Sequence, residues 1–342
     1  MNQQYEPSSS LTQFVIDASV AESMTQSMSL LSVPHLLPHL VPSAQSLARP
    51  PISNYHVGAV GLGSDGRVFV GVNLEFPGLP LHHSVHAEQF LLTNLAIHRC
   101  PRLLSLAVSA APCGHCRQFL QELRYSSSLQ ILVTDEDNRV HQNLDRVERH
   151  EINSPNFKPL SAFLPNPFGP HDLLDQETPL LLEHHDNGLD LLPQNDDLHI
   201  DSAHENWGNH PINGNRRNYE RSENLLRESA LEAANKAHAP YSGCPSGVAL
   251  MDCEGNVYKG SYVESAAYNP SLGPAQAALV AYVAGGGGGY DRIVGAALVE
   301  KEGSKVRQED TVRLLLRAIS PKCVFRAFYC DSIGKVCKKV DG

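Results

Sequence analysis

The feature that most constrains the fold of this 342-residue chain is an internal repeat. The pattern Gly-x-Val-(Phe/Tyr)-x-Gly-x-x-x-Glu occurs at residues 66–75 and again 189 positions later, at residues 255–264. Two similar stretches of this kind suggest that one structural unit was duplicated. A chain of this length has room for about two domains with cores of ordinary size. We therefore expect two copies of one fold.

The region around the first copy has the pattern of strands that alternate with helices. Two β-rich runs, residues 57–62 and 68–72, flank Ser64-Asp65-Gly66, which is a hairpin signal. The further expected elements are helices over residues 85–96 and 113–123 and strands over residues 106–109 and 129–133. Strands alternating with helices predict a sheet that is covered on its faces.

Composition divides the chain into four regions. These are a helical N-terminal region (1–50), a first fold copy (51–190), a polar linker (191–222) and a second fold copy (223–342). In the first region, apolar spacing predicts helices over residues 21–31 and 33–47, with Pro34 and Pro38 starting or breaking them. Asn, Asp, His and Pro accumulate over residues 193–221, which is typical of a loop or a disordered linker.

The charge balance argues against a nucleic-acid substrate. The chain has 37 acidic and 27 basic residues and a formal net charge of −10, whereas binding to phosphates leaves a basic footprint. No apolar run is long enough to cross a bilayer, so we expect no membrane contact. The first residues are polar and lack the pattern of a secretory signal, and we expect a cytoplasmic protein.

The first copy carries a metal-binding pattern that is split between two stretches. His86-Ala87-Glu88 comes first, and Pro112-Cys113-Gly114-His115-Cys116 follows. Zinc favours thiolate and imidazole ligands, and a catalytic zinc site keeps its fourth position for water. His86, Cys113 and Cys116 therefore predict an open zinc site, with Glu88 beside it as the group that moves protons. Both ligand groups are expected to open helices, where free N–H groups favour thiolate over thiol.

A Cys-x-x-Cys pair alone would more often be a structural zinc knuckle or a redox pair. The His-x-Glu partner upstream changes this, because the combined pattern is the known signature of zinc deaminases. In the second copy, Pro274 stands at the position of His86, Gln276 at the position of Glu88, and no Cys pair follows. We therefore expect one Zn²⁺ per chain and a second copy without chemistry of its own.

The motifs make a more specific resemblance possible. The stretches that carry it are residues 52–59 (ISNYHVGA), 71–76 (GVNLEF), 86–89 (HAEQ), 112–118 (PCGHCRQ), 168–170 (FGP) and 239–242 (APYS). Over nearly its full length, the chain resembles the duplicated, dimeric cytidine deaminases of plants and some bacteria. The resemblance implies a three-layer α/β/α sandwich, duplicated, behind a small helical N-terminal region. It also implies a homodimer in which the second copy helps to complete the partner's active site.

The resemblance implies substrate-binding residues as well. Asn73 and Glu75 would hold the ribose, which is reasonable because alternate strand positions point to one face and both side chains accept hydroxyl protons. Tyr55 would pack against the pyrimidine, and Phe168 would arrive from the partner subunit to do the same. Without the resemblance, Asn73 and Glu75 would be read as a polar strand end and the two rings as core residues.

The expected activity is zinc-dependent hydrolysis of free cytidine and 2′-deoxycytidine to uridine and 2′-deoxyuridine with release of ammonia, as in pyrimidine salvage. Two alternatives remain open from the sequence. A C-to-U editor of polynucleotides uses the same zinc centre but needs an open basic groove. A catalytically weak pseudoenzyme would keep the fold and the zinc as a binding module.

Overall fold

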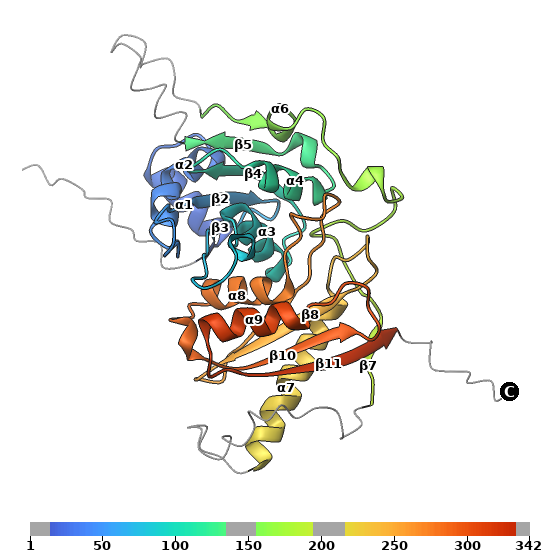
Figure 1. Ribbon diagram of the computed structural model, residues 1–342. Helices are drawn as coiled ribbons and strands as arrows, with labels where there is room; N and C mark the ends of the chain where they lie inside the picture. The colour runs from blue at the N-terminus through green and yellow to red at the C-terminus, as the bar shows by residue number, and fades with distance from the viewer. Residues whose placement is uncertain (1–13, 135–154, 194–215, 333–342) are drawn as a thin grey trace, which may run out of the picture. The chain divides into compact units, whose positions relative to one another are not determined.

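The computed structural model describes residues 14–134, 155–193 and 216–332 (Figure 1). These residues form two compact units. Unit 1 contains the described residues up to Glu183 together with Ser265–Pro270 and Ala284–Gly286. Unit 2 contains His184–Glu264, Ser271–Val283 and the residues from Gly287 onward. None of the helices in the described ranges is long and apolar enough to cross a membrane.

Unit 1 is built on a mixed six-stranded sheet with the strand order β1-β3-β2-β4-β5-β6. Its strands are β1 (Val15–Ile16), β2 (Gly58–Gly63), β3 (Val68–Val72), β4 (Leu103–Val108), β5 (Gln130–Val133) and β6 (Lys158–Pro159). Its helices are α1 (Ala18–Ser27), α2 (Val33–Gln45), α3 (Ala87–Ile97), α4 (Gly114–Phe119) and α6 (Leu160–Phe163). β2 pairs antiparallel with β3 and β4, and β4 pairs parallel with β5. The predicted hairpin is confirmed, and Gly66 turns it with φ +83°.

Two glycines of β2 show that helices cover both faces of this sheet. A Cβ on Gly58 would lie 2.7 Å from the backbone nitrogen of Gln45 in α2. A Cβ on Gly61 would lie 2.9 Å from the side chain of Leu91 in α3. Since successive strand residues point to opposite faces, α2 and α3 lie on opposite sides of the sheet. This is the expected three-layer α/β/α arrangement.

Unit 2 repeats the same core topology on a five-stranded sheet with the order β7-β11-β10-β8-β9. Its strands are β7 (Leu189–Leu191), β8 (Ser246–Asp252), β9 (Val257–Ser261), β10 (Ile293–Lys301) and β11 (Val324–Ser332). Its helices are α7 (Arg216–Asn235), α8 (Pro274–Ala284) and α9 (Glu309–Ile319). β8 pairs antiparallel with β9 and β10, and β10 pairs parallel with β11. The duplication predicted from the repeat is confirmed for the core strands β2, β3, β4 and β5, which correspond to β8, β9, β10 and β11.

The close packing of α3 onto β3 depends on Gly71. A Cβ at this position would lie 2.2 Å from the carbonyl oxygen of Ala87 and 2.6 Å from the nitrogen of Leu91. No real side chain tolerates such distances, so the first turn of α3 can approach the sheet only over a glycine. Gly260 has the same place in unit 2, where a Cβ would lie 2.0 Å from the nitrogen of Ala278. The glycine of the repeat thus determines how closely the following helix packs against the sheet.

Two expectations need correction, one about a helix near the N-terminus and one about the linker between the two fold copies. Pro38 does not break a helix: α2 runs through Pro38 and Pro42, and it starts at Val33 with Pro34 in its first turn. The helix persists because its apolar face is buried, including Leu37 and Leu40, and this burial outweighs two lost N–H groups. The expected linker 191–222 ends in a helix, since α7 begins at Arg216; residues 194–215 lie outside the described part of the chain.

Candidate active site

The two halves of the split motif lie at the starts of two helices. His86 is the N-terminal cap of α3, and Cys113 is the N-terminal cap of α4. Cys116 follows within the first turn of α4 and is fully buried. The connections from β3 to α3 and from β4 to α4 leave the sheet at the same edge, because β3 and β4 both pair antiparallel with β2. The fold therefore brings together residues that are far apart in the sequence.

The donor atoms of this group have the spacing that a zinc ion requires. The Nδ1 atom of His86 lies 3.5 Å from the Sγ of Cys113 and 3.3 Å from the Sγ of Cys116. Tetrahedral zinc with Zn–S and Zn–N bonds of ordinary length places sulfur and nitrogen about 3.6 Å apart. Soft thiolates with an imidazole are also the ligand set that zinc prefers. The residues present can hold this ion.

The pKa values of the two cysteine thiols are shifted in opposite directions. Hydrogen bonds from Cys116 and His86 lower the pKa of Cys113 to about 3. The hydrogen bond to Cys113, together with burial, raises the pKa of Cys116 well above its usual range. One thiolate and one thiol therefore lie next to each other, and the proton between them is one that a metal must displace.

Glu88 lies directly beside this group. Its side chain is only 5% exposed, and its Oε2 atom is 3.2 Å from the sulfur of Cys116. Burial raises the pKa of the Glu88 carboxyl, and this makes it a better proton acceptor than an exposed glutamate. A buried carboxyl with a raised pKa next to a metal group is the arrangement expected of a general acid and base.

His115 belongs to the same cluster, and the sequence analysis assigned it no role. It lies between the two cysteines, and its ring centroid is 4.9 Å from that of His86. Its Nε2 donates a hydrogen bond to the carbonyl oxygen of Asn269 at 3.1 Å. In the described ranges no hydrogen bond joins His115 to either sulfur, whereas His86 contacts both. The geometry favours three protein ligands and one open position.

Asn73 and Glu75 lie where β3 ends, and both are bonded to the loop of residues 52–57. Asn73 accepts a hydrogen bond from the Val57 nitrogen and donates one to the Tyr55 carbonyl, both at 2.9 Å. Glu75 accepts the amide protons of Ile52 and Ser53, each at 2.9 Å, and the Ser53 hydroxyl proton at 2.6 Å. These bonds lower the pKa of Glu75 against the opposing effect of partial burial. Both side chains therefore hold the loop that carries Tyr55.

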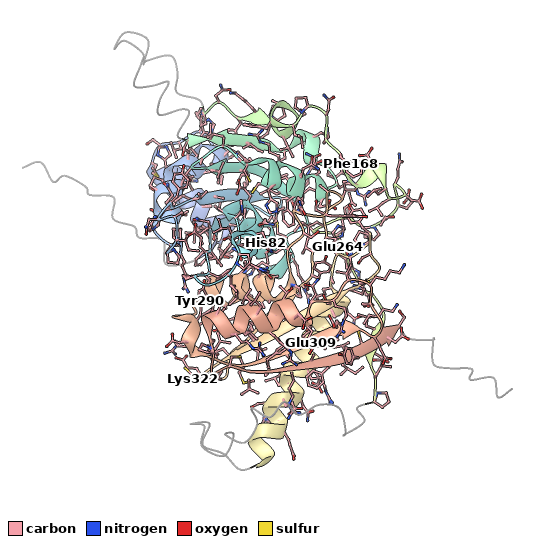
Figure 2. All side chains as sticks on the ribbon, in the orientation of Figure 1. His82, Phe168, Glu264, Tyr290, Glu309 and Lys322 are labelled. Carbon is pink, nitrogen blue, oxygen red and sulfur yellow. The ribbon has the colours of Figure 1, made fainter. Side chains whose placement is uncertain are left out.

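The two predicted aromatic residues are exposed, not in the core. Tyr55 is 56% exposed and Phe168 is 47% exposed. Figure 2 labels Phe168, which follows α6 in the chain. Gln118, in the helix that carries Cys116, donates a hydrogen bond to the Phe168 carbonyl at 2.6 Å. Arg117 donates one to the carbonyl of Pro112, also at 2.6 Å, and so fixes the loop before α4. Gln118 and Arg117 were not assigned a role from sequence, because their acceptors are main-chain atoms.

Unit 2 keeps the loop anchor but not the chemistry. Glu264 accepts hydrogen bonds from the amides of Tyr241 and Ser242 and from the Ser242 hydroxyl, as Glu75 does in unit 1. Tyr262 stands at the position of Asn73, and its side chain is buried beside Ala237 and Ala239. Among the described residues, the cluster of His86, Cys113, His115 and Cys116 is the one group of His, Cys, Asp or Glu side chains that could hold a metal ion.

Comparisons with known proteins agree with this site. Two sequence models with the description "Cytidine and deoxycytidylate deaminase zinc-binding region" match residues 34–131 and 160–313. Cytidine deaminase 1 of Arabidopsis thaliana is 56% identical over 93% of this chain and 97% of its own length. Cytidine deaminase 6 of the same plant is 46% identical over 88% and 94%.

A solved structure is also similar, the cytidine deaminase from Mycobacterium tuberculosis. It has 29% sequence identity and a TM-score of 0.30, and the match covers 39% of this chain and 95% of that one. The matches to the two sequence models and the identity to the Arabidopsis proteins are sufficient to assign the family. The chain is a zinc-binding hydrolase of the cytidine deaminase family.

Proposed function

We propose that the enzyme acts on free cytidine and 2′-deoxycytidine and serves pyrimidine salvage. The observation that carries this proposal is the buried Glu88 carboxyl, 3.2 Å from the sulfur of Cys116 in a group able to hold zinc. The plant relatives are named cytidine deaminases, which supports the same substrate class. The net charge of −10 speaks against a polynucleotide substrate.

In this proposal His86, Cys113 and Cys116 hold the ion, and Glu88 handles the protons. Zinc, when bound, supplies Lewis-acid activation of a water molecule. Glu88 takes one proton from the water and gives it to the ring nitrogen next to the amino-bearing carbon of the base. The hydroxyl group left from the water adds to that carbon, and Glu88 then takes the proton of this hydroxyl group and passes it to the amino group. The carbon–nitrogen bond breaks, ammonia leaves, and a carbonyl group remains.

Asn73 and Glu75 would hold the sugar, and Tyr55 the base. The loop bonds use both lone pairs of the Glu75 Oε2 atom but only one of Oε1, so Oε1 can still accept a proton from a ribose hydroxyl. Tyr55 offers an exposed ring for stacking on a flat base. Phe168, nearly half-exposed, would serve the same purpose in the site of a second subunit of a homodimer.

The state of the thiols favours a reducing compartment such as the cytoplasm. In the described ranges every cysteine is free, including the exposed Cys113 and Cys253. Exposed thiols that must stay free for metal binding are typical of reducing surroundings.

A panel of nucleosides, with zinc measured on the same sample, tests the proposal. We expect cytidine and 2′-deoxycytidine to lose their ultraviolet band as uridine and 2′-deoxyuridine form, with one zinc per chain. Light scattering is expected to give the mass of a dimer. Turnover of single-stranded RNA but not of cytidine would overturn the proposed substrate. Full zinc occupancy without turnover of any pyrimidine nucleoside would point to a binding module.

A further inference from the structure

A short segment that follows β9 in the sequence is part of unit 1 in the fold. Residues Ser265–Pro270 lie between β9 and α8 along the chain, yet they group with the unit that carries the zinc-binding motif. Nothing in the motif analysis gave this segment a role, because the second copy has no ligand residues. Any role of the segment must therefore come from its contacts with the rest of unit 1.

Three side chains of unit 1 bind the main chain of this segment. Glu122 accepts the amide proton of Ala266 at 2.7 Å, and Gln89 donates to the carbonyl of Pro270 at 2.9 Å. His115 donates to the carbonyl of Asn269 at 3.1 Å. Glu122 and Gln89 are almost completely buried, so these bonds form away from water. Hydrogen bonds of this kind are expensive to break, because each leaves a buried group without a partner.

Two of the three side chains, those of Gln89 and His115, are next to residues of the proposed chemistry in the sequence. Gln89 follows Glu88, and its Oε1 also accepts the amide proton of His86 at 3.2 Å. Its side-chain amide thus joins the backbone of a proposed ligand to the segment. His115 lies between Cys113 and Cys116 in the sequence.

Glu122 belongs to the 3₁₀ turn Leu120–Glu122, which continues α4 without a break. The segment is therefore bonded to the start of α3 and to both ends of the α4 region. These are the two helices that must keep a fixed relative position if Glu88 is to stay beside the ligands.

The segment itself is held in an unfavourable backbone conformation. Tyr268 has φ 61°, a left-handed value that residues other than glycine keep only where their surroundings impose it. A tight turn surrounds it, with bonds from the Tyr268 nitrogen to the Ser265 carbonyl and from the Asn269 nitrogen to the Ala267 carbonyl, both at 2.8 Å. These bonds and those from unit 1 side chains hold the main chain of the segment in a defined turn.

We propose that Glu122, Gln89 and His115 are positioning residues that fix α3 and α4 to the 265–270 segment. Through this segment they set the distance between Glu88 and the zinc ligands. The 265–270 segment thereby contributes to catalysis in its own chain, although it holds no ligand. The kinetic consequences rest on the proposed deamination of cytidine, whereas the geometry of the metal site does not.

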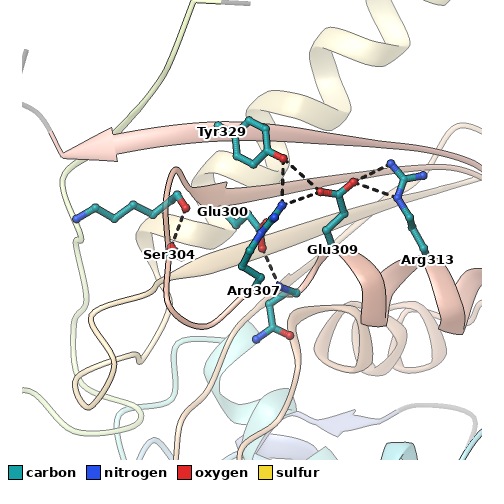
Figure 3. A network of polar contacts seen from close by, with 8 residues as sticks. Glu300, Ser304, Arg307, Glu309, Arg313 and Tyr329 are labelled. Atoms are coloured by element: carbon teal, nitrogen blue, oxygen red, sulfur yellow. Dashed lines mark hydrogen bonds and ion pairs between the residues drawn. The ribbon is translucent and has the colours of Figure 1, made fainter. Parts of the chain in front are cut away.

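Glu122→Ala and Glu300→Ala form a matched pair for the test. Glu300, in unit 2, is also a buried carboxylate that accepts a backbone amide proton at 2.7 Å, from Gln308, and it is paired with Arg307 (Figure 3). Both variants lose the same kind of bond and are expected to lose stability. In Glu122→Ala we expect kcat to fall about 10- to 100-fold with little change in KM, because small misplacements of reacting groups have effects of this size. In Glu300→Ala we expect an unchanged kcat per folded molecule.

A second pair covers the case in which Glu122→Ala does not fold. His115 is only partly buried, so His115→Ala removes the bond to Asn269 with little risk to the core. His115→Gln places an amide nitrogen where Nε2 lies and is expected to restore kcat. A merely structural role would lower stability in both variants without this rescue.

The metal geometry gives a readout that does not need turnover. Cobalt(II) in place of zinc reports ligand geometry through its visible bands, and we expect Glu122→Ala and His115→Ala to shift them while Glu300→Ala does not. Unchanged spectra and unchanged kcat in Glu122→Ala or His115→Ala would overturn the proposal. So would an equal loss of kcat per folded molecule in Glu122→Ala and Glu300→Ala. A wild type inactive on cytidine would overturn the proposed function but leave the cobalt comparison valid.

Discussion

The Oε2 atom of Glu88 lies 3.2 Å from the sulfur of Cys116, and both groups are buried. Glu88 is the second residue of α3, whereas Cys116 is in the first turn of α4. In the proposed mechanism Cys116 is a zinc ligand, and a carboxylate this close to it is placed to exchange protons with a water molecule held there. The contact therefore supports the roles proposed for the two residues.

Replacing Glu88 by glutamine should separate chemistry from metal binding. The amide has the same shape but neither accepts nor releases a proton at neutral pH, so we expect kcat to fall by about 10²- to 10⁴-fold. Zinc content should stay at one per chain, because Glu88 is not among the proposed ligands. Turnover assays with zinc quantified on the same sample check this. A Glu88→Gln enzyme with full zinc and wild-type turnover would contradict the mechanism.

Glu75 and Glu264 allow the substrate role of Glu75 to be told apart from its structural role. Each carboxylate accepts two backbone amides and a serine hydroxyl, so either change to alanine should lower the free energy of unfolding. We expect a loss of about 1–3 kcal/mol in both. Glu75→Ala should also raise KM about 10- to 150-fold, because a hydrogen bond from a sugar hydroxyl to a charged group is worth about 1.5–3 kcal/mol.

Denaturant unfolding and steady-state kinetics on both variants provide the comparison. Glu264→Ala should leave KM as it is. If the two variants changed KM equally, or if neither did, Glu75 would have only the task of anchoring its loop.

How much of this could be predicted from the sequence depends on what kind of partner a residue has. His86, Cys113 and Cys116 were predicted together, because a metal requires side chains of particular types at particular spacings. The hairpin followed from two β-rich runs on either side of a turn signal, and the duplication of the fold followed from the repeat. In these cases side-chain identity carries the signal.

The remaining features depend on main-chain partners, which leave no trace in the sequence. Glu122, Gln89 and His115 bind the backbone of Ala266, Pro270 and Asn269, and almost any residue could supply those atoms. Pro38 was expected to limit a helix because local propensity disfavours it there. Burial of the apolar face of α2 decides otherwise, and burial is a property of the whole fold.

Gly71→Ala should disturb the active site through the backbone. The added Cβ would meet the Ala87 carbonyl at 2.2 Å, so the first turn of α3, which carries Glu88, must move away from the sheet. Gly260→Ala creates the same conflict with Ala278 in unit 2, at 2.0 Å. Overpacking of this kind costs about 1–3 kcal/mol, and we expect both variants to be destabilised by about that amount.

The two glycine variants should differ in turnover. We expect kcat per folded molecule to fall in Gly71→Ala and to stay at the wild-type level in Gly260→Ala, as measured at a temperature where both remain folded. Equal turnover in the two variants would show that the distance between α3 and the sheet does not control the position of Glu88.

Zinc affinity should rise with pH, in two stages. The hydrogen bond to Cys113 raises the pKa of His86, and the shared proton and burial raise that of Cys116, whereas Cys113 is already a thiolate above about pH 3. Zinc binds only deprotonated ligands, so each proton displaced changes the affinity about tenfold per pH unit. Above the pKa of His86, only the proton of Cys116 is displaced, and the slope should be one. Below it, a second proton leaves with it, and the slope should approach two.

Competition with a chelator of known proton affinity measures these slopes, over a pH range that extends further above the ordinary histidine pKa than below it, because the hydrogen bond to Cys113 raises the pKa of His86. The sign follows from the direction of the shifts: lowering the pH stabilises the protonated, metal-free protein at His86 and Cys116, and the ion is lost. Glu88→Gln is the control, because it leaves the protons on His86 and Cys116 in place. Its zinc affinity should therefore keep the slope that approaches two at low pH. An affinity that did not change with pH would mean that the thiol and the imidazole are not the groups that hold zinc.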